Sequence, residues 1–205
     1  MKNQLDSGFF IPLFAPERHK QRLSQKKNRL REFFSAFLAV KRFGMEDNMA
    51  IRNIRTLGDE ILTKHAKEVT QMTPKLKELI GDMFDTMYEA NGCGLAAPQV
   101  GIRKRLVVID CGDEPYVLIN PEILETDGEQ TGQEGCLSVP GKVGIVTRPN
   151  YAKVKALDEN MNEYIIEGTE LLARCLCHEI DHLNGIMYVD KVEGQLMDTE
   201  EENED

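Results

Sequence analysis

Two histidines four positions apart lie inside an apolar segment toward the C-terminal end of the chain. The pentapeptide is His178-Glu179-Ile180-Asp181-His182, and leucine, cysteine and isoleucine surround it at helical spacing. Residues four apart share one face of a helix, so the two imidazoles can bind one metal ion. Glu179 follows the first histidine, where its carboxylate can act on a water without being a ligand. The segment therefore predicts a buried helix that carries half of a catalytic metal site.

The pentapeptide leaves the third ligand open, because catalytic sites commonly use three protein ligands and one open position. Glu193 and Glu200 are downstream candidates, and either would make the protein a zinc endopeptidase. The upstream candidate is Cys136, in a short glycine-containing turn able to aim a thiolate; otherwise it is a buried structural thiol. A non-enzymatic alternative is a structural zinc module or a ribosome-associated binding protein, but a structural site closes with four ligands and needs no acid or base.

A third segment is rich in small residues and reads Gly92-Cys93-Gly94-Leu95-Ala96-Ala97-Pro98-Gln99. Two glycines and two alanines let the backbone approach another group closely. The Gln99 amide can donate a hydrogen bond to an oxyanion. Taken alone, the segment is equally compatible with an ordinary tight loop.

The remaining pattern predicts an α+β fold, with mostly antiparallel β-sheets packed around the central helix that carries the histidines. One helix is expected from Thr73-Pro74, a capping hydroxyl followed by proline, to Asn91-Gly92. The metal helix is expected from near Thr169 to Asn184-Gly185. Strands dominate the middle without regular βαβ alternation, which favours antiparallel pairing. The expected strands are residues 105–110, 116–120, 151–157 and 163–167.

Charge divides the chain into three expected regions. Residues 1–48 carry ten Lys/Arg and five Asp/Glu (+5), whereas residues 49–205 carry fifteen and thirty (−15), which together give the net charge of −10. We expect residues 1–48 to be a dispensable basic extension outside the catalytic domain, with a helix that touches a membrane or an RNA as the alternative. The catalytic domain is expected over 49–192, and residues 193–205 are expected to form an acidic, disordered tail.

Composition also limits location and partners. No apolar run is long enough for a transmembrane helix. An acidic body repels phosphates, which argues against nucleic acid as the direct substrate and against DNA binding. The five cysteines are odd in number and no secretory signal is convincing, so we expect a reducing cytoplasm rather than a disulfide framework.

Taken in order, the three segments resemble the peptide deformylase family. That family carries G-x-G-L-A-A-x-Q, then E-G-C-L-S, then H-E-x-x-H, and this chain has all three at the family's spacings. The resemblance extends from about Met49 to about Val192. The short end after the metal helix is similar to that of clostridial and other Gram-positive-like members. Three ordered motifs are far more specific than the pentapeptide alone.

The resemblance implies a metal-dependent hydrolase that removes the N-formyl group from formyl-methionine at the start of newly synthesised polypeptides and releases formate. Cys136, His178 and His182 would bind one divalent ion. Iron(II) is favoured by the family, and zinc or nickel is possible, because one thiolate and two imidazoles do not select the metal. Glu179 would take a proton from water and deliver it to the leaving amine. Gln99 and the backbone N–H of Leu137 would hold the oxyanion.

Further roles follow from the same resemblance. Glu134 would pair with Arg148 to fix the turn that holds Cys136, the alternative being a surface ion pair of little energy. Three positions depart from the family pattern and put the pocket shape in doubt: Cys93, Arg174 and Cys177. The expected partners are formyl-methionyl nascent peptides and the ribosome near its exit tunnel. The residues expected to bind substrate are Gly92, Cys93, Gly94, Leu171 and Cys175.

Overall fold

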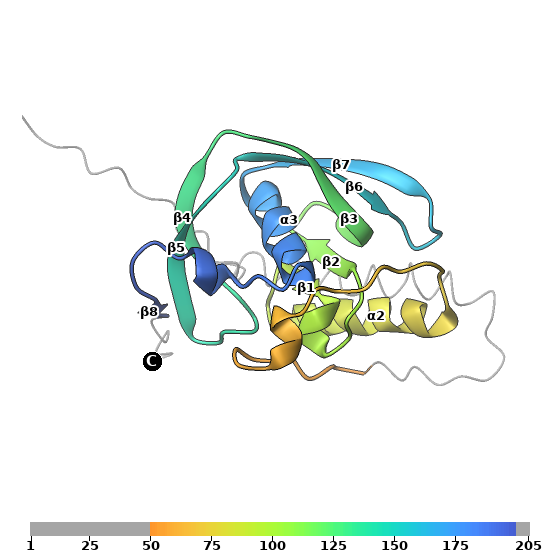
Figure 1. Cartoon of the computed structure of the whole chain (residues 1–205). Coiled ribbons are helices and arrows are strands. Elements are labelled where there is room, and N and C mark those ends of the chain that lie inside the picture. Colours follow the sequence, from red (N-terminus) through yellow and green to blue (C-terminus); the bar gives the residue numbers. More distant parts are fainter. Residues whose placement is uncertain (1–49, 200–205) are drawn as a thin grey trace, which may run out of the picture.

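Two α-helices and two antiparallel sheets make up the part of the chain that the structure, a computed structural model, describes: residues 50–199. Figure 1 shows the helix α3 (Glu170–Leu183) in the middle of the molecule, between the strands β6 and β7 and the helix α2 (Pro74–Glu89). Three short 3-10 helices connect these elements: η1 (Glu60–Thr63), η2 (Ala97–Val100) and η3 (Tyr188–Lys191).

The larger sheet has five strands in the order β1-β2-β3-β6-β7, and the smaller has three in the order β4-β5-β8. Neighbouring strands within each sheet are antiparallel. This arrangement around α3 confirms the predicted α+β class. The strands of the larger sheet are β1 (Gly94–Ala96), β2 (Leu106–Asp110), β3 (Pro115–Asp127), β6 (Tyr151–Leu157) and β7 (Glu163–Thr169); those of the smaller are β4 (Gln130–Gly135), β5 (Lys142–Arg148) and β8 (Met197–Asp198).

Both α-helices begin where the sequence predicts. The Thr73 hydroxyl accepts a hydrogen bond from the backbone N–H of Leu76 at 3.2 Å, and Pro74 follows at the first helical position. A side-chain acceptor and a residue without an N–H are the two local features that favour a helix start. Thr169 occupies the corresponding N-cap position of α3, although its side chain makes no capping hydrogen bond.

Strand β2 lies between two hydrophobic cores, which explains its continuous apolar sequence. Val107 and Ile109 belong to the core beneath α3, whereas Leu106 and Val108 belong to the core beneath α2. Side chains alternate between the two faces of a strand, so a strand with a helix on each face must be apolar at every position. Its partner β1 is equally buried, and β1 packs against the metal helix α3.

Strand β3 is longer than its predicted 116–120. It runs on past Pro121, and its pairing with β6 shifts register between Ile119 and Glu122. Asn120 has a φ of 49°, the left-handed conformation that accommodates such a bulge. Proline is tolerated in a strand at a bulge. Because of this irregularity, the sequence pattern did not predict the second half of the strand.

The C-terminal segment differs in part from the expected disordered tail. Residues 193–199 lie against the smaller sheet: the Glu193 N–H donates to the Ile145 carbonyl at 2.7 Å, and β8 pairs with β5. Residues 200–205 and the basic extension 1–48 lie outside the described residues. Within residues 50–199 none of the helices is long and apolar enough to span a membrane.

Candidate metal centre

Three donor atoms from two separate segments meet beside α3. His178 and His182 are one helical turn apart on α3, and their Nε2 atoms lie 3.1 Å from each other. Cys136 follows the end of β4, and its Sγ lies 3.2 Å from the His182 Nε2. The three donor atoms all lie within 4.8 Å of one another, and all three residues are buried. The structure thus brings together the pentapeptide and the upstream cysteine.

The arrangement of these donors fits a metal ion. Two imidazole nitrogens that face each other with lone pairs repel, so a proton or a cation must lie between them. Donors that share a tetrahedral ion, at bond lengths of about 2.0–2.3 Å, lie roughly 3.3–3.7 Å apart. The observed separations of 3.1 and 3.2 Å therefore require only a small outward movement. One thiolate with two imidazoles is a set used for zinc and iron alike.

Glu134, at the end of β4, orients the first histidine. Its Oε1 accepts hydrogen bonds from His178 Nδ1 at 2.6 Å and from Arg148 Nη2 at 2.6 Å, and its Oε2 accepts from Arg148 Nε at 3.1 Å. Arg148 also donates to Asp181, next to the second ligand, at 2.5 Å. Because His178 uses Nδ1 on the carboxylate, its Nε2 is left to face the other two donors.

The charges around Glu134 keep it ionised although it is buried. Burial opposes the charged form, but the hydrogen bonds and positive charges of His178 and Arg148 outweigh it and hold the pKa of Glu134 well below its usual range. For His178, burial is outweighed by its contacts with Cys136 and Glu134, which raise its pKa. For His182, burial and the neighbouring His178 lower the pKa. One imidazole therefore holds a proton more readily than the other in the metal-free protein.

Glu179 lies in the opposite kind of environment. Its carboxylate is buried, and Oε2 has no hydrogen-bond partner among the described residues. Burial, only partly offset by the positive charge of His178, raises the pKa of Glu179 to about 7. Gly94 on β1 faces it so closely that a Cβ there would lie 2.5 Å from Glu179 Oε1 and 2.8 Å from Cys175 Sγ. A carboxyl poised near neutral pH in a tight pocket is suited to carry a proton.

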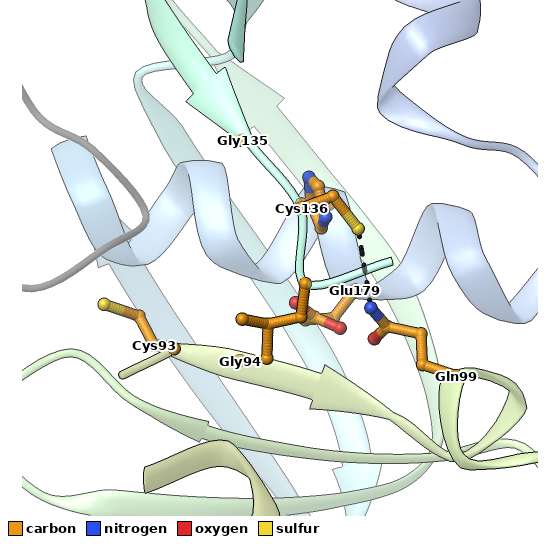
Figure 2. Close-up of a pocket in the computed structure, with 9 residues that line it drawn as sticks. Cys93, Gly94, Gln99, Gly135, Cys136 and Glu179 are labelled. Carbon is orange, nitrogen blue, oxygen red and sulfur yellow. Dashed lines mark hydrogen bonds between the residues drawn. The ribbon is translucent and has the colours of Figure 1, made fainter. Parts of the chain in front are cut away.

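Gln99, in η2, is held so that its amide donor points at the site. Its Oε1 accepts from the backbone N–H of Ala96 at 2.8 Å. An N–H can only donate, so the amide oxygen must face Ala96 and the NH₂ group must face away. Nε2 then lies 3.4 Å from Cys136 Sγ and 3.2 Å from Ser138 Oγ. Figure 2 shows the first of these contacts as a dashed line, with Glu179 beside it.

A small pocket opens onto these groups. Leu171 and Cys175, both expected to bind substrate, are not among its lining residues; Cys175 is fully buried behind it, with Sγ 3.6 Å from the Cys93 carbonyl oxygen. Glu193 is exposed and belongs to no ligand cluster, and Glu200 lies outside the described residues. The sequence-predicted residues that line the pocket are Gly92, Cys93, Gly94, Gln99, Cys136, Leu137, His178 and Glu179.

Two contributions were missed by the sequence reasoning. Arg174 was named only as a departure from the family pattern that put the pocket shape in doubt; it does not line the pocket, and its guanidinium is buried against Glu134, 2.8 Å from Oε2. Its position four residues before His178 places both on one helix face, which was the available signal.

The segment before η1 also contacts the site. The Arg55 backbone N–H donates to the Gln99 carbonyl at 2.6 Å, and the Leu57 backbone N–H donates to the Ser138 carbonyl at 2.8 Å. Both are backbone-to-backbone hydrogen bonds, which any residue type can make, so the amino-acid sequence carries no signal for them.

Comparison with known proteins agrees with the geometry. The sequence model described as polypeptide deformylase matches residues 51–197. A peptide deformylase of Agathobacter rectalis is 68% identical over 150 residues, which cover 73% of this chain and 95% of that protein. Peptide deformylase 1 of Clostridium acetobutylicum is 59% identical over 144 residues, covering 70% and 96%.

Solved structures are similar in the same region. A peptide deformylase from Legionella pneumophila has a TM-score of 0.69 and 52% identity, and the match covers 70% of this chain and 87% of that one. A peptide deformylase from Synechococcus elongatus in complex with actinonin has a TM-score of 0.69 and 44% identity, covering 75% and 86%.

Proposed function

The chain belongs to the polypeptide deformylase family, and we propose that Cys136, His178 and His182 hold its metal ion while Glu179 moves the proton. The protein is a metal-dependent hydrolase that removes the N-formyl group from newly synthesised polypeptides and releases formate. The observation that carries the ligand assignment is the convergence of two imidazole nitrogens and one thiol sulfur, all buried, within 4.8 Å.

A divalent ion held there supplies Lewis acidity, which polarises a carbonyl and lowers the pKa of water. In the proposed mechanism Glu179 accepts a proton from the attacking water and passes it to the leaving amine. Its support is its place in the pocket beside the ligands, together with burial that raises its pKa to about 7 in the metal-free protein. The formyl oxygen accepts hydrogen bonds from Gln99 Nε2 and the Leu137 backbone N–H as it gains charge.

We propose that substrate enters along β1, past Gly92, Cys93 and Gly94, which line the pocket. A Cβ at Gly92 would lie 2.7 Å from Leu137 Cδ1 and one at Gly94 would lie 2.5 Å from Glu179 Oε1, so the two glycines let the backbone approach these groups closely. Cys175 packs behind these residues, with its Sγ 3.6 Å from the Cys93 carbonyl oxygen, and Leu171, four residues before it on α3, remains a proposed substrate contact. Glu134 and Arg148 support the ligands from the opposite side, through the hydrogen bond between Glu134 and His178.

Iron(II) is the proposed native ion, and it rests on the family resemblance, since the donor set suits zinc and nickel as well. The test is formate release from a formyl-methionyl peptide by anaerobically prepared full-length protein, with its metal content measured. We expect formate from the formyl peptide, none from the acetyl analogue, and about one metal ion per chain, chiefly iron. Cleavage of internal peptide bonds without formate release would contradict the proposal.

We further propose that residues 49–192 form the catalytic domain and that the basic residues 1–48 bring it to the ribosome. The support is charge alone: +5 in the extension against −15 in the rest. Co-sedimentation with ribosomes should be stronger for the full chain than for one starting at Met49, and the difference should shrink at high salt. Equal binding by the two would contradict the ribosome proposal, and deformylase activity that disappears without residues 1–48 would contradict the domain assignment.

A further inference from the structure

Arg174 is a buried arginine whose partners all lie on the smaller sheet. It stands on α3 with only 3% of its surface exposed. Nη1 donates to Glu134 Oε2 at 2.8 Å and to the Val146 carbonyl at 3.1 Å, and Nη2 donates to the Gln130 carbonyl at 3.1 Å. One guanidinium thus joins the metal helix to both β4 and β5. The proposed mechanism gives this residue no role.

Arg174 and His178 approach the same carboxylate from the same helix face. His178 Nδ1 donates to Oε1 of Glu134, and Arg174 Nη1 donates to Oε2. A carboxylate with a donor on each oxygen cannot rotate about its terminal bond without breaking one of the two contacts. Arg148 also donates to both oxygens, so the Arg174 contact adds to the restraint on the plane of the carboxylate, and through it on the direction of the imidazole ring.

The second arginine at Glu134 does not make Arg174 redundant. Arg148 is shared between two carboxylates, Glu134 and Asp181. Among the described residues the one carboxylate paired with Arg174 is Glu134. A buried carboxylate is costly unless it is both paired and hydrogen-bonded, and a divided partner compensates it less than a dedicated one.

We infer that Arg174 is a positioning residue for metal binding. It holds Glu134 in the orientation in which Oε1 accepts from His178, so that His178 Nε2 faces Cys136 and His182. The inference rests on the proposed ligand set and extends it to a residue that touches neither metal nor substrate. Residues that orient metal ligands typically change metal affinity by about 10–100-fold when removed.

The test separates this role from simple tethering of α3. Full-length Arg174→Met, Arg174→Lys, Glu134→Gln and the Glu134→Gln/Arg174→Met double variant are loaded with cobalt(II). The dissociation constant is measured by chelator competition, the visible cobalt spectrum is recorded, and stability is followed by urea unfolding. Arg105→Met is the matched control. Arg105 also ties the end of α3, through Asn184 Oδ1 at 2.9 Å, but has no contact with Glu134.

We expect Arg174→Met to weaken cobalt binding about tenfold or more and to alter the spectrum, with partial rescue by Arg174→Lys. Adding Arg174→Met to Glu134→Gln should change affinity less than twofold further, because the first change already removes the carboxylate through which Arg174 acts. Arg105→Met should lower stability only. If Arg174→Met fails to fold, Arg174→Lys decides the question, with weaker cobalt binding than wild type expected.

Two results would overturn the inference: unchanged cobalt affinity in folded Arg174 variants, or full additivity in the double variant. Failure of the ligand set itself would look different. Cys136→Ala would then bind cobalt as tightly as wild type, whatever Arg174 does.

Discussion

Two buried glutamates flank His178, and they lie in opposite surroundings. Glu134 belongs to what we call the charged wall, with Arg148 and Arg174, and three residues donate hydrogen bonds to it. Glu179 belongs to the apolar wall, with Gly94 and Cys175, and its Oε2 has no partner among the described residues. The pKa of Glu134 is held well below its usual range, whereas that of Glu179 is raised to about 7.

The difference shows how one residue type serves two purposes at one metal centre. A carboxylate that never takes a proton is a fixed acceptor, suited to orient a ligand. A carboxylate with a pKa near 7 exchanges its proton readily at neutral pH, as a general acid and base must. Surroundings that push the pKa values of two acids apart thereby assign their roles.

The largest effect is expected from Cys136→Ala, which removes the proposed thiolate ligand. Two imidazoles alone leave the ion without its thiolate, so bound metal and formate release should both be lost. Metal analysis after gel filtration and a formate assay check this. Cys177→Ala is the control, a buried thiol on the metal helix that is not in the ligand cluster. Retention of metal by Cys136→Ala would show that another residue is the third ligand.

Gln99→Ala tests the proposed hydrogen bond from Gln99 Nε2 to the formyl oxygen. Removing one preorganised donor to an oxyanion lowers kcat by about 10²–10³-fold. We expect that loss in steady-state formate release, with metal content unchanged. Ser138→Ala, which removes only one contact of Nε2 (3.2 Å), should have a much smaller effect. A Gln99→Ala enzyme with near wild-type kcat would exclude the oxyanion role.

Gly94→Ala narrows the apolar wall. The new Cβ would lie 2.5 Å from Glu179 Oε1, so the carboxylate must move. Displacing a reacting group by about 1 Å can cost roughly a hundredfold in rate. We expect kcat to fall by about that factor, with stability reduced by about 1–3 kcal/mol. Gly81→Ala on α2, where a Cβ meets nothing within 4 Å, should leave kcat unchanged. Equal kcat for both variants would mean that Glu179 has more freedom than the structure shows.

Glu179→Gln tests the raised pKa of Glu179 through the pH dependence of the free energy of unfolding. In the metal-free protein the pKa of Glu179 rises from 4.5 to about 7 on folding, so the folded state binds the proton more tightly. Stability from this group is present below pH 4.5 and is lost as pH rises through 7. Glutamine cannot ionise, so Glu179→Gln should gain stability relative to wild type as pH rises from 4.5 to 7. The difference in the free energy of unfolding should reach about 3 kcal/mol. Urea unfolding at pH 5 and pH 8 measures it. Exposed Glu193→Gln is the control, and a gain independent of pH would contradict the assignment.

Much of this arrangement could be predicted from the sequence because the determinants are local. Thr73-Pro74 marks a helix start by its own chemistry, and the spacing of His178 and His182 places both on one face of α3. The three short motifs, through the family they resemble, predicted which segments meet. Each of these depends on residues that are close together in the chain.

The charged wall was harder to predict because it depends on packing between distant segments. Arg174 reaches Gln130, Glu134 and Val146 through the pairing of β4 with β5, neither of which was predicted as a strand. In the sequence, the charge of Arg174 and its apolar neighbours are equally compatible with a place in a pocket or on the surface. The close approach of Gly94 to Glu179 likewise depends on how β1 packs against α3, and sequence spacing alone does not specify that.

The most direct test compares Glu179→Gln with Glu134→Gln in one experiment that measures both metal affinity and formate release. The account predicts that Glu179→Gln keeps its metal and loses about 10²–10⁴-fold in hydrolysis. Glu134→Gln should instead bind metal about 10–100-fold more weakly, with hydrolysis restored in large part when excess metal saturates the site. Equal behaviour of the two variants, or loss of metal from Glu179→Gln, would contradict the division of roles between the walls.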